Sequence, residues 1–173
     1  MKIGKIALSL AAVGLLLLQV GCAGSKALAV RPLETNLSPF TSIYFSTESS
    51  IVDDVSQQMD DLEVEFLERL NKEGYFPTAL LGTCAENCEK ALVIKAVVSS
   101  VKKVSGASRF FLGAFAGKAS LTTEVTFIDG GSGATIGSYE VTGKSGGTGY
   151  SGGTGDAVKK TAKAIVELIK ENF

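Results

Sequence analysis

KASLTTEVTFID, residues 118–129, is the stretch that decides the fold. Ala119, Leu121, Val125 and Phe127 alternate with more polar side chains, and this period of two predicts a strand with one buried face. The turn-forming run DGGSG that closes this stretch predicts that the chain reverses into a second strand over residues 135–142. An antiparallel strand pair is therefore the expected centre of a sheet.

Upstream of this pair, a different period predicts an amphipathic helix from Ser50 to just before Gly74. Ser50 is a favourable N-cap, and Asp53 and Asp54 suit the positive end of a helix dipole. Lys72 followed by Gly74 indicates the helix end. Apolar residues spaced by three or four mark the face that we expect to be buried: Val52, Val55, Met59, Leu62, Phe66 and Leu70.

A second helix is expected over residues 156–173, with an apolar face formed by Val158, Ala162, Ile165, Leu168, Ile169 and Phe173. Further strands are expected over residues 40–46, 75–81 and 91–104. Together these elements predict an α+β fold: a two-layer sandwich, with a mostly antiparallel four- to five-stranded sheet and two helices packed on one face. Residues 40–173 are then one globular domain, whose second sheet face is solvated or covered by a partner.

Residues 1–21 have the pattern of an export signal. Two lysines precede an apolar run over residues 6–18, which is too short for a typical membrane-spanning helix. The sequence LQVGC, residues 18–22, resembles the lipobox of bacterial lipoproteins, in which the cysteine receives acyl chains such as palmitate. This resemblance implies a lipid anchor at Cys22; the alternative is an ordinary secretory signal with a cysteine nearby.

The mature chain beginning at Cys22 has a net charge near −3, because removal of two signal lysines lowers the 17 Lys and Arg to 15 against 18 Asp and Glu. Ala23 stands where similar lipoproteins carry the Asp that retains them in the inner membrane. The resemblance therefore implies the outer membrane, with the domain facing the periplasm. Residues 22–39 lack sustained periodicity and predict a flexible tether, with the alternative that Leu28–Val30 pairs as an edge strand.

Cys84 and Cys88 are the two remaining cysteines, and export places them in an oxidising compartment. Their short separation predicts a local disulfide worth on the order of 1–2 kcal/mol, because closing a short loop restricts the unfolded chain only slightly. Free thiols and a redox pair are the alternatives. A metal site is not expected, since two thiolates without histidine are too few ligands.

Composition excludes several classes of function. The chain has 173 residues and no histidine, which removes imidazole general bases, Ser-His-Asp triads and zinc sites with histidine ligands. The net charge of −1 gives no basic field for nucleic acid. Lys144 follows a glycine as in a phosphate-binding loop, but the upstream glycine spacing is wrong, so no nucleotide is expected. The acids Asp60, Asp61, Glu63, Glu65 and Glu68 are interpreted as a solvated helix face, so we expect no enzyme and no cofactor.

Glycine gathers in GASRFFLGAFAGKA, residues 106–119, and in GKSGG, residues 143–147. With the strand that ends at Asp129 and the glycine turn after it, this pattern resembles the bacterial lipoproteins of domain-of-unknown-function family 4410. The resemblance covers most of residues 90–173 and implies an envelope location and a fold, but no reaction.

An apolar run within this region forms a candidate interaction loop: Arg109, Phe110, Phe111, Leu112 and Phe115. Three interpretations stay open: a buried crossover between strands, a surface for self-association or a partner, and a membrane-touching loop. Overall, the sequence favours a non-catalytic, lipid-anchored envelope protein acting as an interaction or assembly module, either with itself or with another envelope protein. The alternative is a periplasmic carrier or sensor of a small apolar or anionic ligand, bound at the sheet face or at the helix start Gly155-Asp156.

Overall fold

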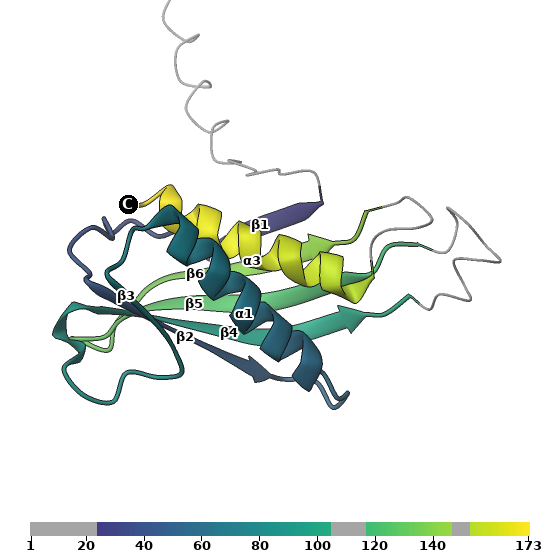
Figure 1. Cartoon of the computed structure of the whole chain (residues 1–173), viewed down its shortest axis with the longest axis horizontal. Coiled ribbons are helices and arrows are strands. Elements are labelled where there is room, and N and C mark those ends of the chain that lie inside the picture. The colour runs from purple at the N-terminus through teal and green to yellow at the C-terminus, as the bar shows by residue number, and fades with distance from the viewer. Residues whose placement is uncertain (1–23, 105–116, 147–152) are drawn as a thin grey trace, which may run out of the picture.

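The computed structural model describes residues 24–104, 117–146 and 153–173 (Figure 1). These residues form six strands, two α-helices and one short 3-10 helix. The strands are β1 (Ser25–Arg31), β2 (Ser42–Ser49), β3 (Thr78–Leu81), β4 (Ala91–Lys102), β5 (Ser120–Asp129) and β6 (Thr135–Lys144). The helices are α1 (Ser56–Glu73), η1 (Cys88–Lys90) and α3 (Thr154–Lys170).

The strands form one mixed sheet in the order β1-β6-β5-β4-β2-β3. β4, β5, β6 and β1 pair antiparallel, whereas β2 runs parallel to both β3 and β4. The prediction of four to five mostly antiparallel strands is therefore wrong in number and in part of the pairing. The parallel pairs arise because α1 returns the chain along the sheet between β2 and β3, and the segment with η1 returns it again between β3 and β4, so all three strands run in the same direction.

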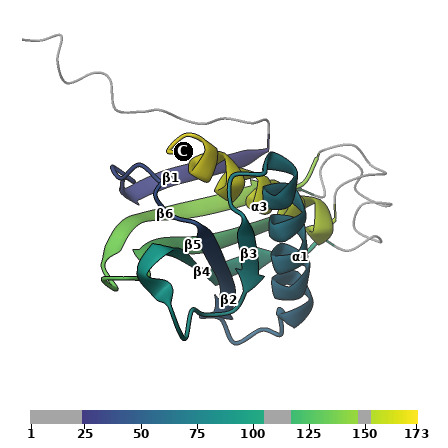
Figure 2. The ribbon, with the colours of Figure 1, turned by 60° about the vertical axis from the view of Figure 1, so that its left-hand side comes forward.

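Both helices cover the same face of the sheet, as Figures 1 and 2 show. The buried residues of α1 and α3 meet the alternate side chains of β2, β4, β5 and β6 in a single core. Phe45 of β2 and Phe66 of α1 stack with ring centroids 4.0 Å apart. Thus the α+β class and the placement of both helices on one face agree with the sequence prediction.

The segment expected to be a tether over residues 22–39 is folded onto the domain from Ser25 onward, so that prediction and the domain start at residue 40 are wrong. β1 pairs antiparallel with β6, and Leu28 lies opposite Glu140. This pairing agrees with the alternative that Leu28–Val30 belongs to an edge strand. The segment lacks a clear alternation of apolar and polar residues, because this edge strand has no buried face along most of its length.

The chain beyond β1 closes one end of the core. Leu33 and Leu37 are buried, and the backbone N–H of Leu33 donates to the Tyr139 hydroxyl at 2.8 Å. The N–H of Leu37 donates to the carbonyl of Asn172, also at 2.8 Å. A side chain at Gly137 would place its Cβ 2.6 Å from Leu33, so this glycine makes room for the crossing segment. The segment therefore belongs to the core.

α1 begins six residues later than Ser50, the predicted N-cap. The backbone N–H of Ser50 donates to the carbonyl of Val98 at 3.0 Å, which extends the β2–β4 ladder and holds Ser50 outside the helix. Asp54 instead accepts hydrogen bonds from the backbone N–H and hydroxyl of Ser56. Val52, expected on the buried face, is fully exposed for the same reason.

The strand expected over residues 75–81 is confined to β3. Phe76 turns into the core and Pro77 cannot donate a ladder hydrogen bond, so pairing starts only at Thr78. Phe173, expected on the buried face of the last helix, lies beyond α3 and stacks on Tyr75 with centroids 4.8 Å apart. The other predicted elements match the observed ones to within a few residues.

Candidate functional site

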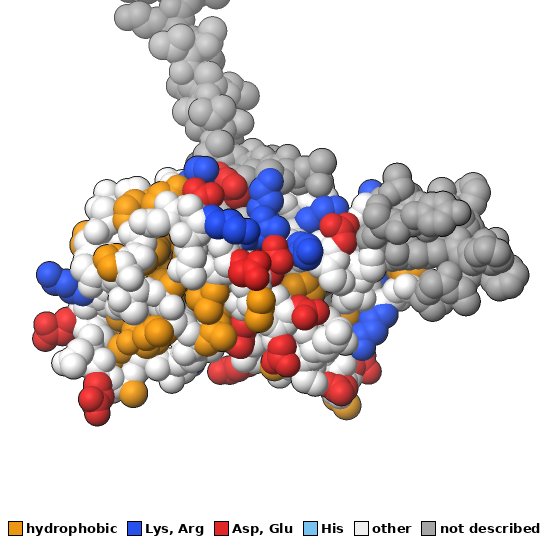
Figure 3. Space-filling model, viewed as in Figure 1, with side chains coloured by type: hydrophobic (Ala, Val, Ile, Leu, Met, Phe, Trp, Pro, Cys, Tyr) orange, Lys and Arg blue, Asp and Glu red, His pale blue; other side chains and the backbone are white. Residues whose placement is uncertain are grey.

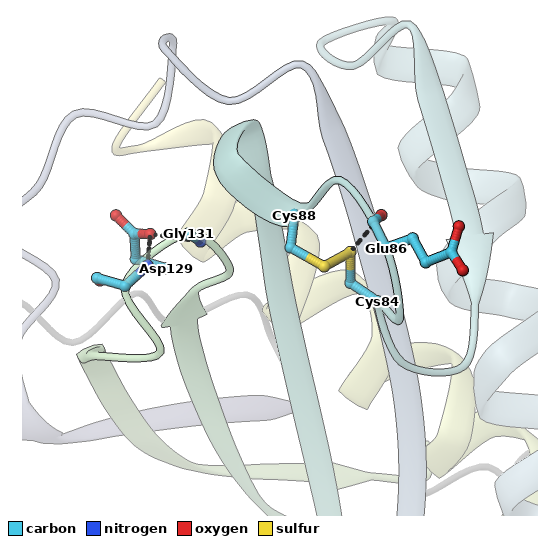
Figure 4. Close-up of a disulfide and its surroundings, with 6 residues drawn as sticks. Cys84, Glu86, Cys88, Asp129 and Gly131 are labelled. Atoms are coloured by element: carbon cyan, nitrogen blue, oxygen red, sulfur yellow. Dashed lines mark hydrogen bonds between the residues drawn. A yellow bond between two sulfur atoms is a disulfide. The ribbon is translucent and has the colours of Figure 1, made fainter.

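The disulfide predicted between Cys84 and Cys88 is confirmed (Figure 4). It closes the loop between β3 and η1, beside the β5–β6 turn, where Asp129 Oδ1 accepts a 2.9 Å hydrogen bond from the N–H of Gly131. The backbone of Gly130 in that turn donates to the carbonyl of Ala91 at 2.8 Å. The disulfide thus closes a loop directly before β4, next to the β5–β6 turn.

Two of the predicted sites lie outside the described residues: the lipidation site Cys22 and the candidate interaction loop. The loop comprises Arg109, Phe110, Phe111, Leu112 and Phe115. The lipidation site and the interaction loop both remain predictions. Val104 follows β4 and Gly117 precedes β5, and both lie at the end of the sheet where β1 begins.

At this end the first described residue is bound firmly to the sheet. The carbonyl of Gly24 accepts a 2.6 Å hydrogen bond from the N–H of Lys144. Lys160 of α3 covers Gly24, and its Nζ donates to the carbonyl of Lys144 at 3.0 Å. Ser145, just after β6, bonds to both backbone groups of Ala119. The starts of β1 and α3 and the end of β6 therefore form one rigid corner.

The helix start proposed as an anion site already holds a carboxylate of the chain. Asp156 Oδ2 accepts hydrogen bonds from the N–H of Gly146 at 2.7 Å and from Lys160 Nζ at 3.0 Å. Burial raises the pKa of Asp156, but these hydrogen bonds and the charges of Lys160 and Lys159 outweigh it, so the pKa lies below its usual value. An ionised carboxylate here repels a second anion and disfavours this position as a site for an anionic ligand.

Among the described residues, the face of the sheet away from the helices is mixed: Tyr44, Val93 and Ile128 pair across β2, β4 and β5, and charged residues lie farther along the strands. Glu124 and Glu140 are exposed and lie opposite each other on β5 and β6, in a row that ends with Leu28 on β1. Directly opposed like charges destabilise a strand pair. Lys95 and Thr126 pair in the adjacent row. The rows that contain Glu124, Glu140 and Lys95 are poorly suited to an apolar small ligand.

Among the acids of α1, Glu63 and Glu65 depart from the expected solvated face. Asp60, Asp61 and Glu68 are exposed, and Figure 3 shows acidic side chains along this helix. Glu63 instead accepts hydrogen bonds from the N–H and hydroxyl of Thr47, at 3.1 and 2.7 Å, and ties α1 to β2. In the groove between the two helices, charged side chains pair with one another, Arg69 with Glu65 and Lys170 with Glu73.

Among the described residues, no group of three or more acidic or cysteine side chains is arranged to hold a metal ion. No described helix is both long and apolar enough to cross a membrane.

The two edge strands carry most of the exposed large apolar side chains in the described part of the chain. On β1, Leu28 is 38% and Val30 77% exposed. On β3, Leu80 is 44% and Leu81 45% exposed. We call these four residues the edge apolar residues. Sequence reasoning missed them as a set, because β1 and β3 lie at opposite edges only through the sheet order.

Comparison with known proteins identifies relatives by family and by fold. Residues 41–149 match the model of a family described as a domain of unknown function, DUF4410. No curated protein matches the sequence.

Among solved structures, the chain is similar to PelC from Paraburkholderia phytofirmans, a dodecamer, with 15% identity and a TM-score of 0.57 over 83% of this chain and 96% of PelC. A neuraminyllactose-binding hemagglutinin homolog from Helicobacter pylori matches at 14% identity and a TM-score of 0.39, over 81% of this chain and 86% of that one. A DUF330 protein from Xanthomonas campestris matches at 9% identity and 0.42, over 82% and 83%. The likeness to PelC shows a shared fold.

Proposed function

This chain belongs to the DUF4410 family, and from that premise we propose that it is a non-catalytic, lipid-anchored protein of the cell envelope that acts by assembling with copies of itself. Its anchor is the acylated Cys22, and its domain faces the periplasm from the outer membrane. Interaction with another envelope protein would use the same assembled form.

The observation that carries the assembly proposal is the placement of the edge apolar residues. Leu28 and Val30 lie on one edge of the sheet, and Leu80 and Leu81 lie on the other. Apolar side chains exposed at a sheet edge favour contact with another chain. Because the two surfaces lie at opposite edges, the β1 edge of one copy can meet the β3 edge of the next, and each copy then uses both surfaces.

The PelC structure adds support at the level of fold. That protein, which forms a dodecamer, matches 83% of this chain with a TM-score of 0.57. At 15% identity the likeness extends to the arrangement of the backbone, so the number of copies is a separate question for this chain.

The test of assembly uses the mature chain with Cys22→Ser, so that acylation does not contribute to its size. Multi-angle light scattering measures its mass alone and with Leu28→Lys on β1 or Leu80→Lys on β3. We expect an oligomer that both substitutions dissociate, because each would bury a charge in the contact. Val64→Lys is the matched control, since Val64 is 55% exposed on α1, away from the edges. A monomeric parent chain, or equal dissociation by Val64→Lys, would refute assembly through the edges.

The test of the anchor is separate. The full chain is expressed with Cys22 or with Cys22→Ser, and membrane and soluble fractions of the envelope are compared. The acylated chain should partition with outer membranes and the variant should be released, because acyl chains supply the membrane affinity. If the variant stays with the membrane to the same extent, the anchor at Cys22 is wrong.

A further inference from the structure

Lysine gathers at the end of the sheet where β1 begins. Seven of the 17 basic residues lie there, contributed by β1, β4, β6, α3 and the segments beside β4 and β5. We call this set the lysine end: Lys26, Lys102, Lys103, Lys118, Lys144, Lys159 and Lys160.

Strand register brings these lysines together from distant parts of the sequence. Lys102 of β4 and Lys144 of β6 both pair with Ser120, which lies between them on β5. Lys26 pairs with Thr142 and so lies diagonally next to Lys144. Adjacent strands are about 4.8 Å apart, so the row from β4 to β1 spans about 15 Å.

Most of these amino groups have no carboxylate partner among the residues that the structure describes. All seven lysines except Lys160 are exposed. Of these seven, only Lys160 pairs with a described carboxylate, that of Asp156. Lys103 Nζ donates to the backbone carbonyl of Asp54, at the approach to α1. The rest of the mature chain is strongly acidic, because it has a net charge near −3 despite this cluster.

The chain leading to Cys22 ends at the same place. Gly24 is hydrogen-bonded to Lys144, and two peptide units separate its Cα from that of Cys22. Consecutive Cα atoms are 3.8 Å apart, so the acylated residue lies within about 8 Å of this fixed point. Once Cys22 is inserted in a bilayer, headgroups lie within roughly one Debye length of Gly24 and so close to the nearest lysines, Lys26 and Lys144.

We propose that the lysine end is a docking surface for anionic phospholipid headgroups, which holds the domain upright on the membrane. This inference rests on the proposed anchor at Cys22. Lysines close to an anionic surface are attracted to it, and the effect falls off within a Debye length. The end with the Cys84–Cys88 disulfide, where β4 starts, is then directed away from the bilayer.

The experiment couples the mature chain chemically to a bilayer. The thiol of Cys22 is joined to a maleimide lipid in vesicles of phosphatidylcholine alone or of phosphatidylcholine with one-third phosphatidylglycerol. Cys84 and Cys88 do not react, because they form a disulfide. A water-soluble acetylating reagent then labels the lysines, and mass spectrometry gives the rate at each. Lys72 and Lys90, which lie away from the lysine end, are internal controls.

We expect acetylation of Lys26, Lys102, Lys118 and Lys144 to be slower on the anionic vesicles than on the neutral ones, by about fivefold for a lysine held at the surface. High salt should remove the difference, while the control lysines keep equal rates on both vesicles. Equal rates at the lysine end on both vesicles would overturn the proposal, and so would equal slowing at all lysines.

Failure of this proposal is distinguishable from failure of the proposed function. Chemical coupling replaces cellular acylation, so the labelling result does not depend on whether Cys22 is acylated in the cell. Fractionation of the Cys22→Ser chain reports the natural anchor, and light scattering reports assembly. If the lysine end is acetylated fast on anionic vesicles at every salt concentration, while Cys22→Ser still releases the chain from membranes, only the docking surface is refuted.

Discussion

Leu37→Ala tests whether the segment after β1 is part of the folded core. Leu37 is fully buried, and its substitution removes three carbons from the side chain. At about 0.8 kcal/mol per buried methylene, the lost transfer free energy is about 2.4 kcal/mol. The cavity left behind adds to this, so the expected destabilisation is about 3 kcal/mol, within the usual range for buried leucines.

The measurement is urea unfolding of the mature chain followed by circular dichroism, with the disulfide intact and the m-value compared between variants. In a thermal scan, the same destabilisation lowers the melting temperature by about 6–12 °C for a chain of this size. Val30→Ala is the control from the same segment, since Val30 is 77% exposed, and we expect a change of about 0.5 kcal/mol or less. If Leu37→Ala also changes the free energy of unfolding by less than about 0.5 kcal/mol, the segment is a tether after all.

Three further variants test other parts of the structure. Gly143→Ala would place a Cβ 2.1 Å from the carbonyl oxygen of Ala157, so we expect a loss of about 3 kcal/mol or more in urea unfolding, and a stable variant would mean that α3 packs farther from β6. Replacing both Cys84 and Cys88 by serine should lower the free energy of unfolding by at most about 2 kcal/mol and leave the circular dichroism spectrum unchanged. An unfolded product would contradict a disulfide with only a local effect. Asp156→Asn should lower the free energy of unfolding modestly at neutral pH. Because the pKa of Asp156 is lowered in the folded state, the carboxylate stabilises the fold above its unfolded pKa near 4, and this stabilisation is lost as the pH falls through the folded pKa. A difference in stability between the two chains that persists unchanged at pH 2 would contradict the ion pair.

Periodicity was enough to predict the elements that bury a regular stripe. The residues of β5 and β6 alternate, and the predicted apolar stripes of α1 and α3 are observed apart from Val52, which precedes α1, and Phe173, which lies beyond α3. β1 was predicted only as an alternative, over Leu28–Val30, because the apolar side chains of this edge strand lie mostly at the surface. The parallel pairing of β2 with β4 depends on the path of the whole chain, which no local pattern records.

The functional surfaces divide in the same way. The Cys84–Cys88 bond follows from spacing and compartment, so the sequence predicts it. The lysine end does not follow from spacing, because Lys26, Lys102 and Lys144 are neighbours only through the register of β1, β6, β5 and β4. Ser50 shows the opposite case, a favourable capping residue whose backbone is already engaged by β4.

The hydrogen bond that fixes Gly24 to Lys144 also limits the symmetry of any assembly on a membrane. With a long tether, copies could face in opposite directions and still reach the same bilayer. With only two peptide units between Cys22 and this fixed point, every copy must present the same end to the lipid. Rings whose single rotation axis stands normal to the bilayer satisfy this condition, whereas dihedral assemblies, which turn half of their subunits over, do not.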